Sequence, residues 1–283
     1  MYFSVTHTTC YKYSKVVTDS FNDAHLCPVS DNFQICEEFL LETNPSVKTV
    51  LRRLDFFTNQ VHHFEVLEPH RLLQVVAKSK VITNEDFRDY TVISDACTLK
   101  ELLKDEQYYD FLQASERVAL SSPVLFELSH LQLEKSDVRL HAEGIMRFIY
   151  TDFEYSSGST QVDTPVNRVL ETRKGVCQDF AHLMIALCRA SGIPTRYVSG
   201  YFYVEKRMTE TADDNSASHA WVECFLPCIG WVGYDPTHNR RVDSTYIKLA
   251  IGRDYADVRP LAGTYKGSSS AELSVDVQVV KIT

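Results

Sequence analysis

Residues 173–194 read RKGVCQDFAHLMIALCRASGIP and predict a helix with a cysteine in its first turn. Apolar residues recur there at intervals of three and four, so the helix has a face to bury. These residues are Phe180, Leu183, Met184 and Leu187. The run Gly192-Ile193-Pro194 ends the helix, because proline cannot continue it. A cysteine placed at the start of a buried helix is the feature that needs an explanation.

Cys177 stands where a helix can activate a thiol. Unpaired backbone N–H groups and the positive end of the helix dipole stabilise a thiolate there. The same N–H groups can hold the oxyanion that forms when the thiolate attacks a carbonyl. Gly175, two residues earlier, lets the chain approach closely. The alternative is a structural cysteine, because cysteine is among the most buried residue types and a single one is usually inert.

Residues 218–237, SHAWVECFLPCIGWVGYDPT, offer the two partners that a thiolate nucleophile needs. His219 opens one alternating strand, Asp235 closes the next, and LPCIG forms the expected turn. If the strands form a hairpin with an even register sum, the two side chains share a face. Asp235 can then hold the imidazole of His219 while its other nitrogen faces Cys177. A hairpin with a polar end and an ordinary Asp-Pro turn explains the same pattern.

The other histidines are weaker candidates for the base. His182 lies five residues after the cysteine on the same helix, so the two side chains point apart. His238 is expected in a loop, and His62 and His63 belong to the β-rich N-terminal part. Asp179 is expected to be a first-turn carboxylate that favours the helix dipole.

Composition excludes several classes of function. The chain has 283 residues, 44% of them apolar, and a net charge of −9 with no basic stretch, which argues against general nucleic-acid binding. No run approaches the ~18 apolar residues of a membrane span. The start of the chain, MYFSVTHTTCYKYS, lacks the apolar centre of a signal peptide. We therefore expect a cytoplasmic protein with neither a nucleic-acid nor a membrane partner.

Eight cysteines are scattered along the chain, at positions 10, 27, 36, 97, 177, 188, 224 and 228. None of them forms a C-x-x-C pair, so structural zinc is not expected. A chain of this length also folds without disulfides. We expect seven of the eight to be reduced and mostly buried, and we expect neither a metal nor another cofactor.

The periodicity predicts an α+β fold in two parts. Residues 1 to about 83 contain short β-branched and aromatic runs separated by turn signals, which predicts antiparallel strands. Helical periodicity follows, and strand alternation returns after the cysteine helix and again in the tail AELSVDVQVVKIT. The segment TETADDNSAS at 209–218 is expected to be a mobile loop. We predict an N-terminal antiparallel β domain at residues 1–90 and a catalytic domain at residues 91–283.

Four segments, in this order, resemble the signature segments of the transglutaminase-like superfamily. They are GVCQDF at 175–180, PTRYVSGY at 194–201, HAWVE at 219–223 and WVGYDPT at 231–237. The resemblance implies a papain-like core in which Cys177 is the nucleophile, His219 the general base and acid, and Asp235 the residue that orients the imidazole. The β-rich N-terminus and GRDYADV at 252–258 are similar to bacterial members proposed to be cysteine proteases. Residues 84 to 140 carry least of the resemblance.

One difference separates this chain from the animal cross-linking transglutaminases. Those enzymes have a tryptophan upstream of the cysteine that helps to hold the oxyanion, whereas Trp221 and Trp231 both lie downstream of Cys177. No stretch resembles a calcium loop, and the calcium-regulated cross-linking domains do not fit at this length. We therefore favour hydrolysis of a peptide or other amide bond through a thioester on Cys177, with transfer to an amine as the alternative.

Two further functions use the same core. A binding or scaffold protein would use the β domain as its recognition surface, but a non-catalytic member would be expected to have lost one of the Cys, His and Asp residues. Peptide:N-glycanase-like enzymes usually carry zinc-binding cysteine pairs, which this sequence lacks. The sequence therefore predicts an acyl-transfer enzyme with a peptide or protein substrate.

Overall fold

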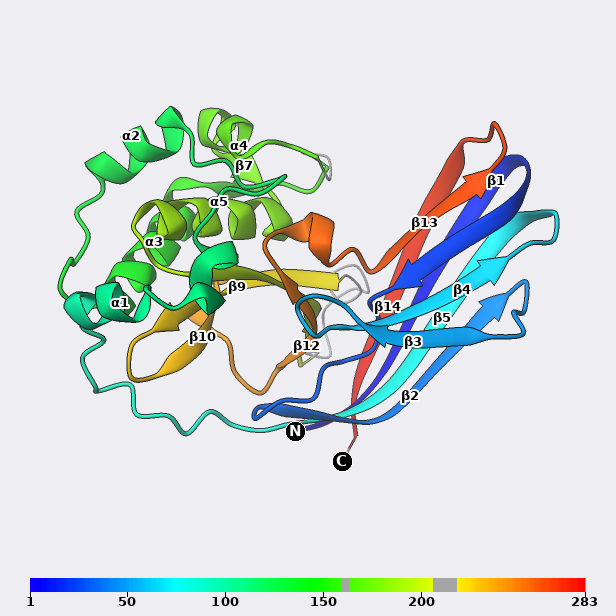
Figure 1. The fold of residues 1–283 in the computed structure, drawn as a ribbon, viewed down its shortest axis with the longest axis horizontal. Coiled ribbons are helices and arrows are strands. Elements are labelled where there is room, and N and C mark those ends of the chain that lie inside the picture. Colours follow the sequence, from blue (N-terminus) through cyan, green and yellow to red (C-terminus); the bar gives the residue numbers. More distant parts are fainter. Residues whose placement is uncertain (159–162, 206–217, 283) are drawn as a thin grey trace.

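The computed structural model describes residues 1–158, 163–205 and 218–282, and Figure 1 shows two sheets joined along the middle of the molecule. The loop predicted at 209–218 lies outside the described residues except for its last position. Within the described ranges no helix is long and apolar enough to cross a membrane. The first sheet carries no helices, whereas helices cover the second. The predicted α+β class is confirmed.

The first sheet is built on one long strand, β1 (Tyr2–Ala24). Its pairing with β5 (His70–Thr83) shifts register between Lys12 and Val17. The first half of β1 also pairs with β14 (Ala271–Ile282), the strand that the tail sequence predicts. This half is therefore held between a strand from the N-terminal part and a strand from the C-terminal end.

The second half of β1 pairs with β4 (Gln60–Val66) and β13 (Leu261–Lys266). The outer strands are β2 (Gln34–Asn44), which pairs with β5, and β3 (Val50–Leu54), which pairs with β4. The sheet of the first ninety residues is thus completed by β13 and β14, which the sequence analysis had assigned to the catalytic part. The division of the chain at residue 90 stays a prediction.

The second sheet is antiparallel and carries the predicted site residues. Its strands, in spatial order, are β11 (Arg240–Arg241), β10 (Gly230–Asp235), β9 (Ser218–Leu226), β8 (Thr195–Phe202) and β12 (Tyr246–Gly252). Gly230 pairs with Leu226, so β9 and β10 form the predicted hairpin with an even register sum. Odd-numbered side chains of both strands therefore share one face.

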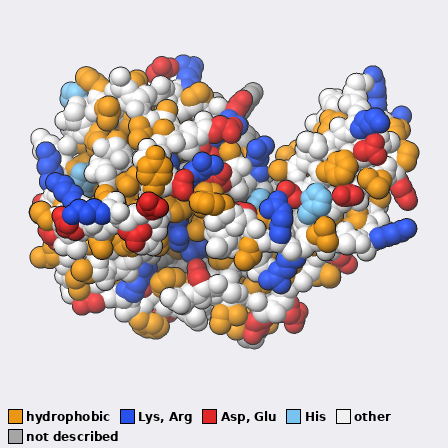
Figure 2. Space-filling model, viewed as in Figure 1, with side chains coloured by type: hydrophobic (Ala, Val, Ile, Leu, Met, Phe, Trp, Pro, Cys, Tyr) orange, Lys and Arg blue, Asp and Glu red, His pale blue; other side chains and the backbone are white. Residues whose placement is uncertain are grey.

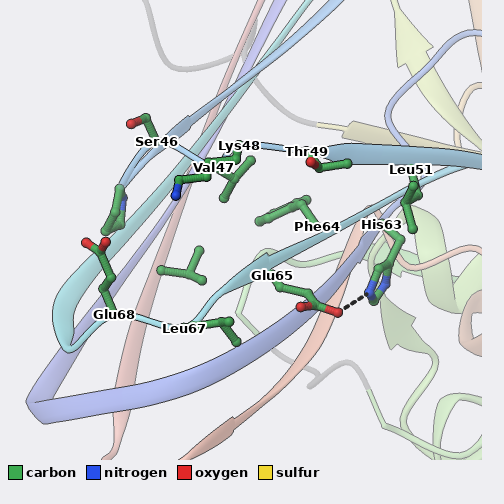
Figure 3. A pocket seen from close by; sticks show the side chains of 12 residues that line it. Ser46, Val47, Lys48, Thr49, Leu51, His63, Phe64, Glu65, Leu67 and Glu68 are labelled. Carbon is green, nitrogen blue, oxygen red and sulfur yellow. Dashed lines mark ion pairs between the residues drawn. The ribbon is translucent and has the colours of Figure 1, made fainter.

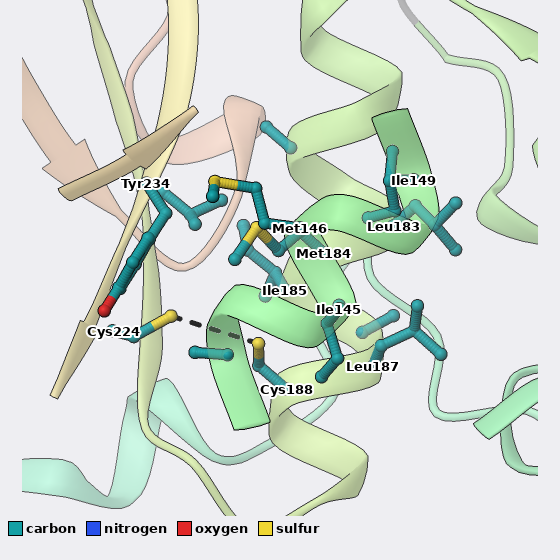
Figure 4. Packing of buried hydrophobic residues seen from close by; sticks show 14 of the residues in the cluster. Ile145, Met146, Ile149, Leu183, Met184, Ile185, Leu187, Cys188, Cys224 and Tyr234 are labelled. Carbon is teal, nitrogen blue, oxygen red and sulfur yellow. Dashed lines mark hydrogen bonds between the residues drawn. The ribbon is translucent and has the colours of Figure 1, made fainter. Parts of the chain in front are cut away.

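Helix α5 (Cys177–Ala190) packs on the other face of this sheet, and Figure 4 shows its contact with Cys224 and Tyr234. The segment from Asp179 to Arg189 is buried throughout, more fully than the predicted single apolar face requires. Further helices pack against it: α2 (Ser122–His130), α3 (Val138–Asp152) and α4 (Val166–Thr172). Helix α1 (Ala96–Leu102) contributes Leu99 to the same core. This surrounding core fixes the position of the first turn of α5.

Residues of the first sheet cover the edge of β12 that no described strand of the second sheet pairs with. The side chain of Gln34 donates to the Lys248 carbonyl at 2.8 Å and accepts from the Lys248 N–H at 2.7 Å. Asn59 bonds to Ile251 in the same way, at 2.7 and 2.8 Å. Side chains thus pair backbone groups that an edge strand would leave open. The strand that carries Tyr246 is held from both sides as a result.

A glycine allows β8, β9 and β12 to approach closely. A Cβ atom on Gly200 would lie 2.1 Å from the Ile247 carbonyl oxygen and 2.4 Å from Cη2 of Trp221. Gly200 also pairs directly with His219 across the β8–β9 ladder. The absence of a side chain at this position therefore sets the spacing beside the predicted catalytic histidine.

We predict that Gly200→Ala lowers the free energy of unfolding by about 1–3 kcal/mol, because a backbone oxygen cannot move aside as a side chain can. The measurement is urea denaturation. Gly144→Ala, in helix α3, is the matched control: its methyl group meets only the side chain of Leu133, with Cδ2 nearest at 2.6 Å. Equal stability of the two variants would show that Gly200 does not set the strand spacing.

Candidate active site

Cys177 is the first residue of α5 and is half-buried. The preceding residues are fixed by a short parallel pair, β6 (Glu154–Tyr155) with β7 (Lys174–Gly175). Next to them, the Ser156 N–H donates to the Gly175 carbonyl at 2.9 Å. The backbone just before Cys177 is therefore fixed by hydrogen bonds to residues 154–156, which lie outside the helix.

Asp179 closes the first turn of α5. Its carboxylate accepts the backbone N–H of Val176 at 2.8 Å. A Cβ atom on Gly175 would lie 2.8 Å from Cβ of Asp179, so Gly175 does permit a close approach. The interpretation of Asp179 as a first-turn carboxylate, rather than a catalytic acid, agrees with these contacts.

His219 and Asp235 are joined by a hydrogen bond of 2.7 Å between Nε2 and Oδ2. The Asp235 side chain is fully buried, and 10% of the His219 side chain is exposed. Burial raises the pKa of Asp235, but the hydrogen bonds from His219 and then His238 outweigh it and hold this pKa well below its usual range. The carboxylate is therefore ionised at neutral pH.

The pKa of His219 responds to both predicted partners. Burial lowers it, but hydrogen bonds with Asp235 and Cys177 outweigh burial and raise the pKa to about 10. Because Nε2 is bonded to Asp235, Nδ1 is the nitrogen available to the Cys177 thiol. The structure thus brings the three predicted site residues into one neighbourhood. Their catalytic roles stay a prediction.

The Asp235 carboxylate also binds two residues that the sequence analysis did not assign to the site. His238 Nδ1 lies 2.7 Å from Oδ2, and the Tyr246 hydroxyl donates to the same oxygen at 2.7 Å. The second oxygen, Oδ1, accepts the Thr237 N–H at 2.8 Å. An aspartate that bonds the backbone two residues on is a common turn motif, and this turn brings His238 back to the carboxylate.

His219, Asp235 and His238 bring possible ligand atoms within 4.8 Å of one another. Nε2 of His219 and Nδ1 of His238 are each hydrogen-bonded at 2.7 Å to the same oxygen, Oδ2 of Asp235. Two atoms that bind one Zn²⁺ at about 2.0–2.2 Å in a tetrahedral site lie more than about 3 Å apart. We therefore interpret this cluster as a hydrogen-bond network rather than a metal centre.

A separate cavity of about 460 Å³ lies in the first sheet, between β4 and the segment that leads into β3. Its apolar lining comes from Val47, Leu51, Phe64, Val66 and Leu67, and His63 pairs with Glu65 at its side over 3.6 Å (Figure 3). No cysteine lines this cavity among the described residues. It therefore does not compete with Cys177 as a site for thiol chemistry.

Charge on the molecular surface is mixed. Figure 2 shows acidic and basic side chains interspersed over the face in view, without a field of one sign. Exposed ion pairs also occur among the described residues, such as Lys80 with Glu38 at 2.9 Å and Lys174 with Glu154 at 2.9 Å. On this face, nothing marks a surface for a polyanion.

The chain is similar over nearly its whole length to the uncharacterized protein Rv2569c of Mycobacterium tuberculosis. The two are 34% identical over 289 residues, which cover 98% of this chain and 92% of that protein. Residues 131–236 match the model of the transglutaminase-like superfamily, and residues 3–82 match the bacterial transglutaminase-like N-terminal region. This chain belongs to the transglutaminase-like superfamily.

Two further similarities concern the fold and one third of the chain. The crystal structure of a proposed cysteine protease from Cytophaga hutchinsonii superposes with a TM-score of 0.81 at 22% identity, over 100% of this chain and 92% of that one. It confirms the predicted fold. A protein-glutamine gamma-glutamyltransferase from Pseudomonas aeruginosa is 34% identical over 98 residues, which cover 33% of this chain and 15% of that enzyme.

We predict that the His219 imidazole titrates near pH 10 instead of near the ordinary 6.5, since Asp235 and Cys177 stabilise its protonated form. The measurement is an NMR titration of histidine-labelled protein. Asp235→Asn removes the carboxylate charge and should return the midpoint by at least one unit toward 6.5. Titration of His219 near 6.5 in the unsubstituted protein would contradict the hydrogen-bonded arrangement.

Proposed function

We propose that the protein is a cysteine-dependent acyl-transfer enzyme that acts on an amide bond of a peptide or protein. Cys177 is the nucleophile, His219 the general base and acid, and Asp235 the residue that orients His219. The observation that carries the proposal is the 2.7 Å hydrogen bond between His219 on β9 and Asp235 on β10. Cys177, at the first turn of α5, is among the groups that raise the pKa of this imidazole. The family of the chain agrees with it.

The first half of the proposed reaction forms a thioester. The Cys177 thiolate attacks the amide carbonyl carbon, and the carbonyl π electrons move to oxygen. Backbone N–H groups at the start of α5 stabilise this oxyanion. The carbonyl re-forms as the C–N bond breaks, and the imidazolium of His219 gives its proton to the departing nitrogen. A free amine leaves, and the acyl group stays on sulfur.

The second half releases the acyl group. Neutral His219 takes a proton from the acceptor, whose oxygen or nitrogen attacks the thioester carbon, and the Cys177 thiolate departs. Water as the acceptor gives a carboxylic acid and an amidase or peptidase. We favour hydrolysis, because no tryptophan precedes Cys177 in this sequence.

An amine acceptor is the second candidate. It is favoured by the likeness of one third of the chain to an enzyme named protein-glutamine gamma-glutamyltransferase. The two outcomes use the same three residues and differ only in the acceptor. A cytoplasmic location, expected from the sequence, also stays a proposal.

We predict that a small alkylating agent at pH 6 modifies Cys177 at least tenfold faster than any other cysteine, because only this thiol has a helix N-terminus and an imidazolium beside it. Peptide mass spectrometry locates the label. Cys228 is exposed and serves as the reference for accessibility alone, whereas the exposed Cys97 lies in the first turn of α1 and is the reference for accessibility combined with a helix N-terminus. His219→Ala should slow the labelling of Cys177, and Asp235→Asn should slow it less. Even labelling of all exposed cysteines would support the scaffold function instead.

The acceptor is identified in a separate assay with a peptide library and a fluorescent primary amine. Hydrolysis yields shortened or deamidated peptides whose mass is unaffected by the amine, whereas transfer yields peptides that carry it. Both products should disappear in Cys177→Ser. Turnover that persists in this variant would exclude Cys177 as the nucleophile.

A further inference from the structure

One oxygen of Asp235 accepts three side-chain hydrogen bonds. Nε2 of His219, Nδ1 of His238 and the hydroxyl of Tyr246 each lie 2.7 Å from Oδ2. The proposed mechanism uses only the first of these contacts. Tyr246 and His238 therefore need an account of their own.

Tyr246 is fixed rigidly against the carboxylate. It is 3% exposed and opens β12, and the Phe202 ring stacks on it at 4.5 Å. The Trp221 ring meets it edge-on at 5.2 Å. Burial raises the pKa of Tyr246, and the neighbouring Asp235 charge raises it further. The hydroxyl thus stays a neutral donor throughout the range in which the site would work.

His238 approaches the same oxygen from the solvent side. Its side chain is 41% exposed, and its ring lies 4.8 Å from Phe202 and 5.2 Å from the ring of His219. The ionisable groups that face this cluster are Cys177, which also raises the pKa of His219, Arg240, which lies over Phe202 and Tyr246, and Asp243, which pairs with Arg240. The charges of Arg240 and Asp243 offset each other, so Asp235 is the charge that His219 senses most directly.

Donors that share one acceptor oxygen compete for its charge. Each hydrogen bond to a carboxylate stabilises the ionised form and lowers its tendency to hold a further proton. In a buried site this effect is less screened than in water. A carboxylate with two extra donors therefore stabilises the imidazolium of His219 less than a carboxylate with none.

We propose that Tyr246 and His238 are positioning residues that share Asp235 with His219 and thereby limit the basicity of the catalytic imidazole. This inference rests on the proposed function, in which His219 must both hold a proton beside the thiolate and give it to the departing amine. A general acid that holds its proton too tightly is slow to release it. The hydrogen bonds from Tyr246 and His238 reduce the stabilisation that the buried Asp235 carboxylate gives to the imidazolium of His219.

The alternative is that both residues only support Asp235 mechanically, and the two roles predict opposite signs. If the donors share the charge, their removal strengthens the bond between Asp235 and His219, and the imidazolium becomes harder to deprotonate. If they only support the carboxylate, their removal loosens this bond, and His219 becomes easier to deprotonate.

The test uses the full chain with Tyr246→Phe, which keeps the ring and loses only the hydroxyl, and separately His238→Gln. The NMR titration midpoint of His219 should rise in Tyr246→Phe by about one pH unit, which is a tenfold increase in the protonation constant. His238→Gln can keep one N–H donor and should shift it less. In both variants kcat should fall while KM stays constant. A lower midpoint in Tyr246→Phe, or an unchanged one, would overturn the inference.

Tyr201→Phe is the matched control. Tyr201 is 1% exposed, and its hydroxyl bonds His7 at 2.9 Å instead of Asp235. Its loss should leave the midpoint of His219 in place, and a shift equal to that of Tyr246→Phe would also overturn the inference. The titration needs no turnover. A protein that titrates as expected without activity would refute the proposed function, whereas an active protein whose midpoint does not rise would refute only this inference.

Discussion

The burial of α5 on every side is the constraint on which the rest of the structure depends. A helix that is buried all round needs partners for any polar side chain that it carries. Arg189 near its C-terminus meets this requirement by donating to backbone carbonyls of Thr195 at 2.8 Å, Arg253 at 2.7 Å and Gln113 at 2.8 Å. One side chain therefore connects the C-terminal end of α5 to three separate segments, and Cys177 lies at the N-terminal end.

The segment GRDYADV at 252–258 acquires a structural explanation from the same constraint. Besides the Arg253 carbonyl, it supplies the Tyr255 N–H that donates to Nε2 of His182 at 3.2 Å. His182 is 2% exposed, and burial lowers its pKa to about 4. It is therefore a neutral acceptor within α5 and not a candidate base. This agrees with the sequence argument, which set His182 aside because its spacing points it away from Cys177.

Local pattern predicted the parts of the site that lie within one or two elements. The interval of apolar residues predicted α5, and alternation predicted the β9–β10 hairpin that places His219 near Asp235. Tyr246 could not be found in this way, because its contact with Asp235 depends on β12 pairing with β8 at the far side of the sheet. The same holds for β14, whose alternation is visible in the sequence but whose partner, β1, lies more than 250 residues away. The alternation of apolar and polar residues predicts that a segment is a strand. Which strand it pairs with, when the two are far apart in the sequence, depends on the packing of the whole chain.

Two buried carboxylates on the odd-numbered face of the second sheet show how differently a protein can hold such a charge. Burial raises the pKa of Glu223, but the charges of Arg196 and Lys248 outweigh it and lower this pKa to about 2. Arg196 Nε lies 2.7 Å from Glu223, and Lys248 Nζ lies 2.6 Å from it. Partners that are permanently charged give this carboxylate a fixed structural role.

Asp235, on the neighbouring strand, has no such cation within hydrogen-bond distance among the described residues. Its side-chain partners are two imidazoles and a phenol, so the positive charge opposite it depends on where a proton resides. A carboxylate paired with Arg or Lys holds its partner's proton in place at neutral pH. A carboxylate paired with imidazole stabilises a proton that can still leave. The difference between Glu223 and Asp235 is therefore the difference between a charge that holds the sheet together and a charge suited to proton transfer.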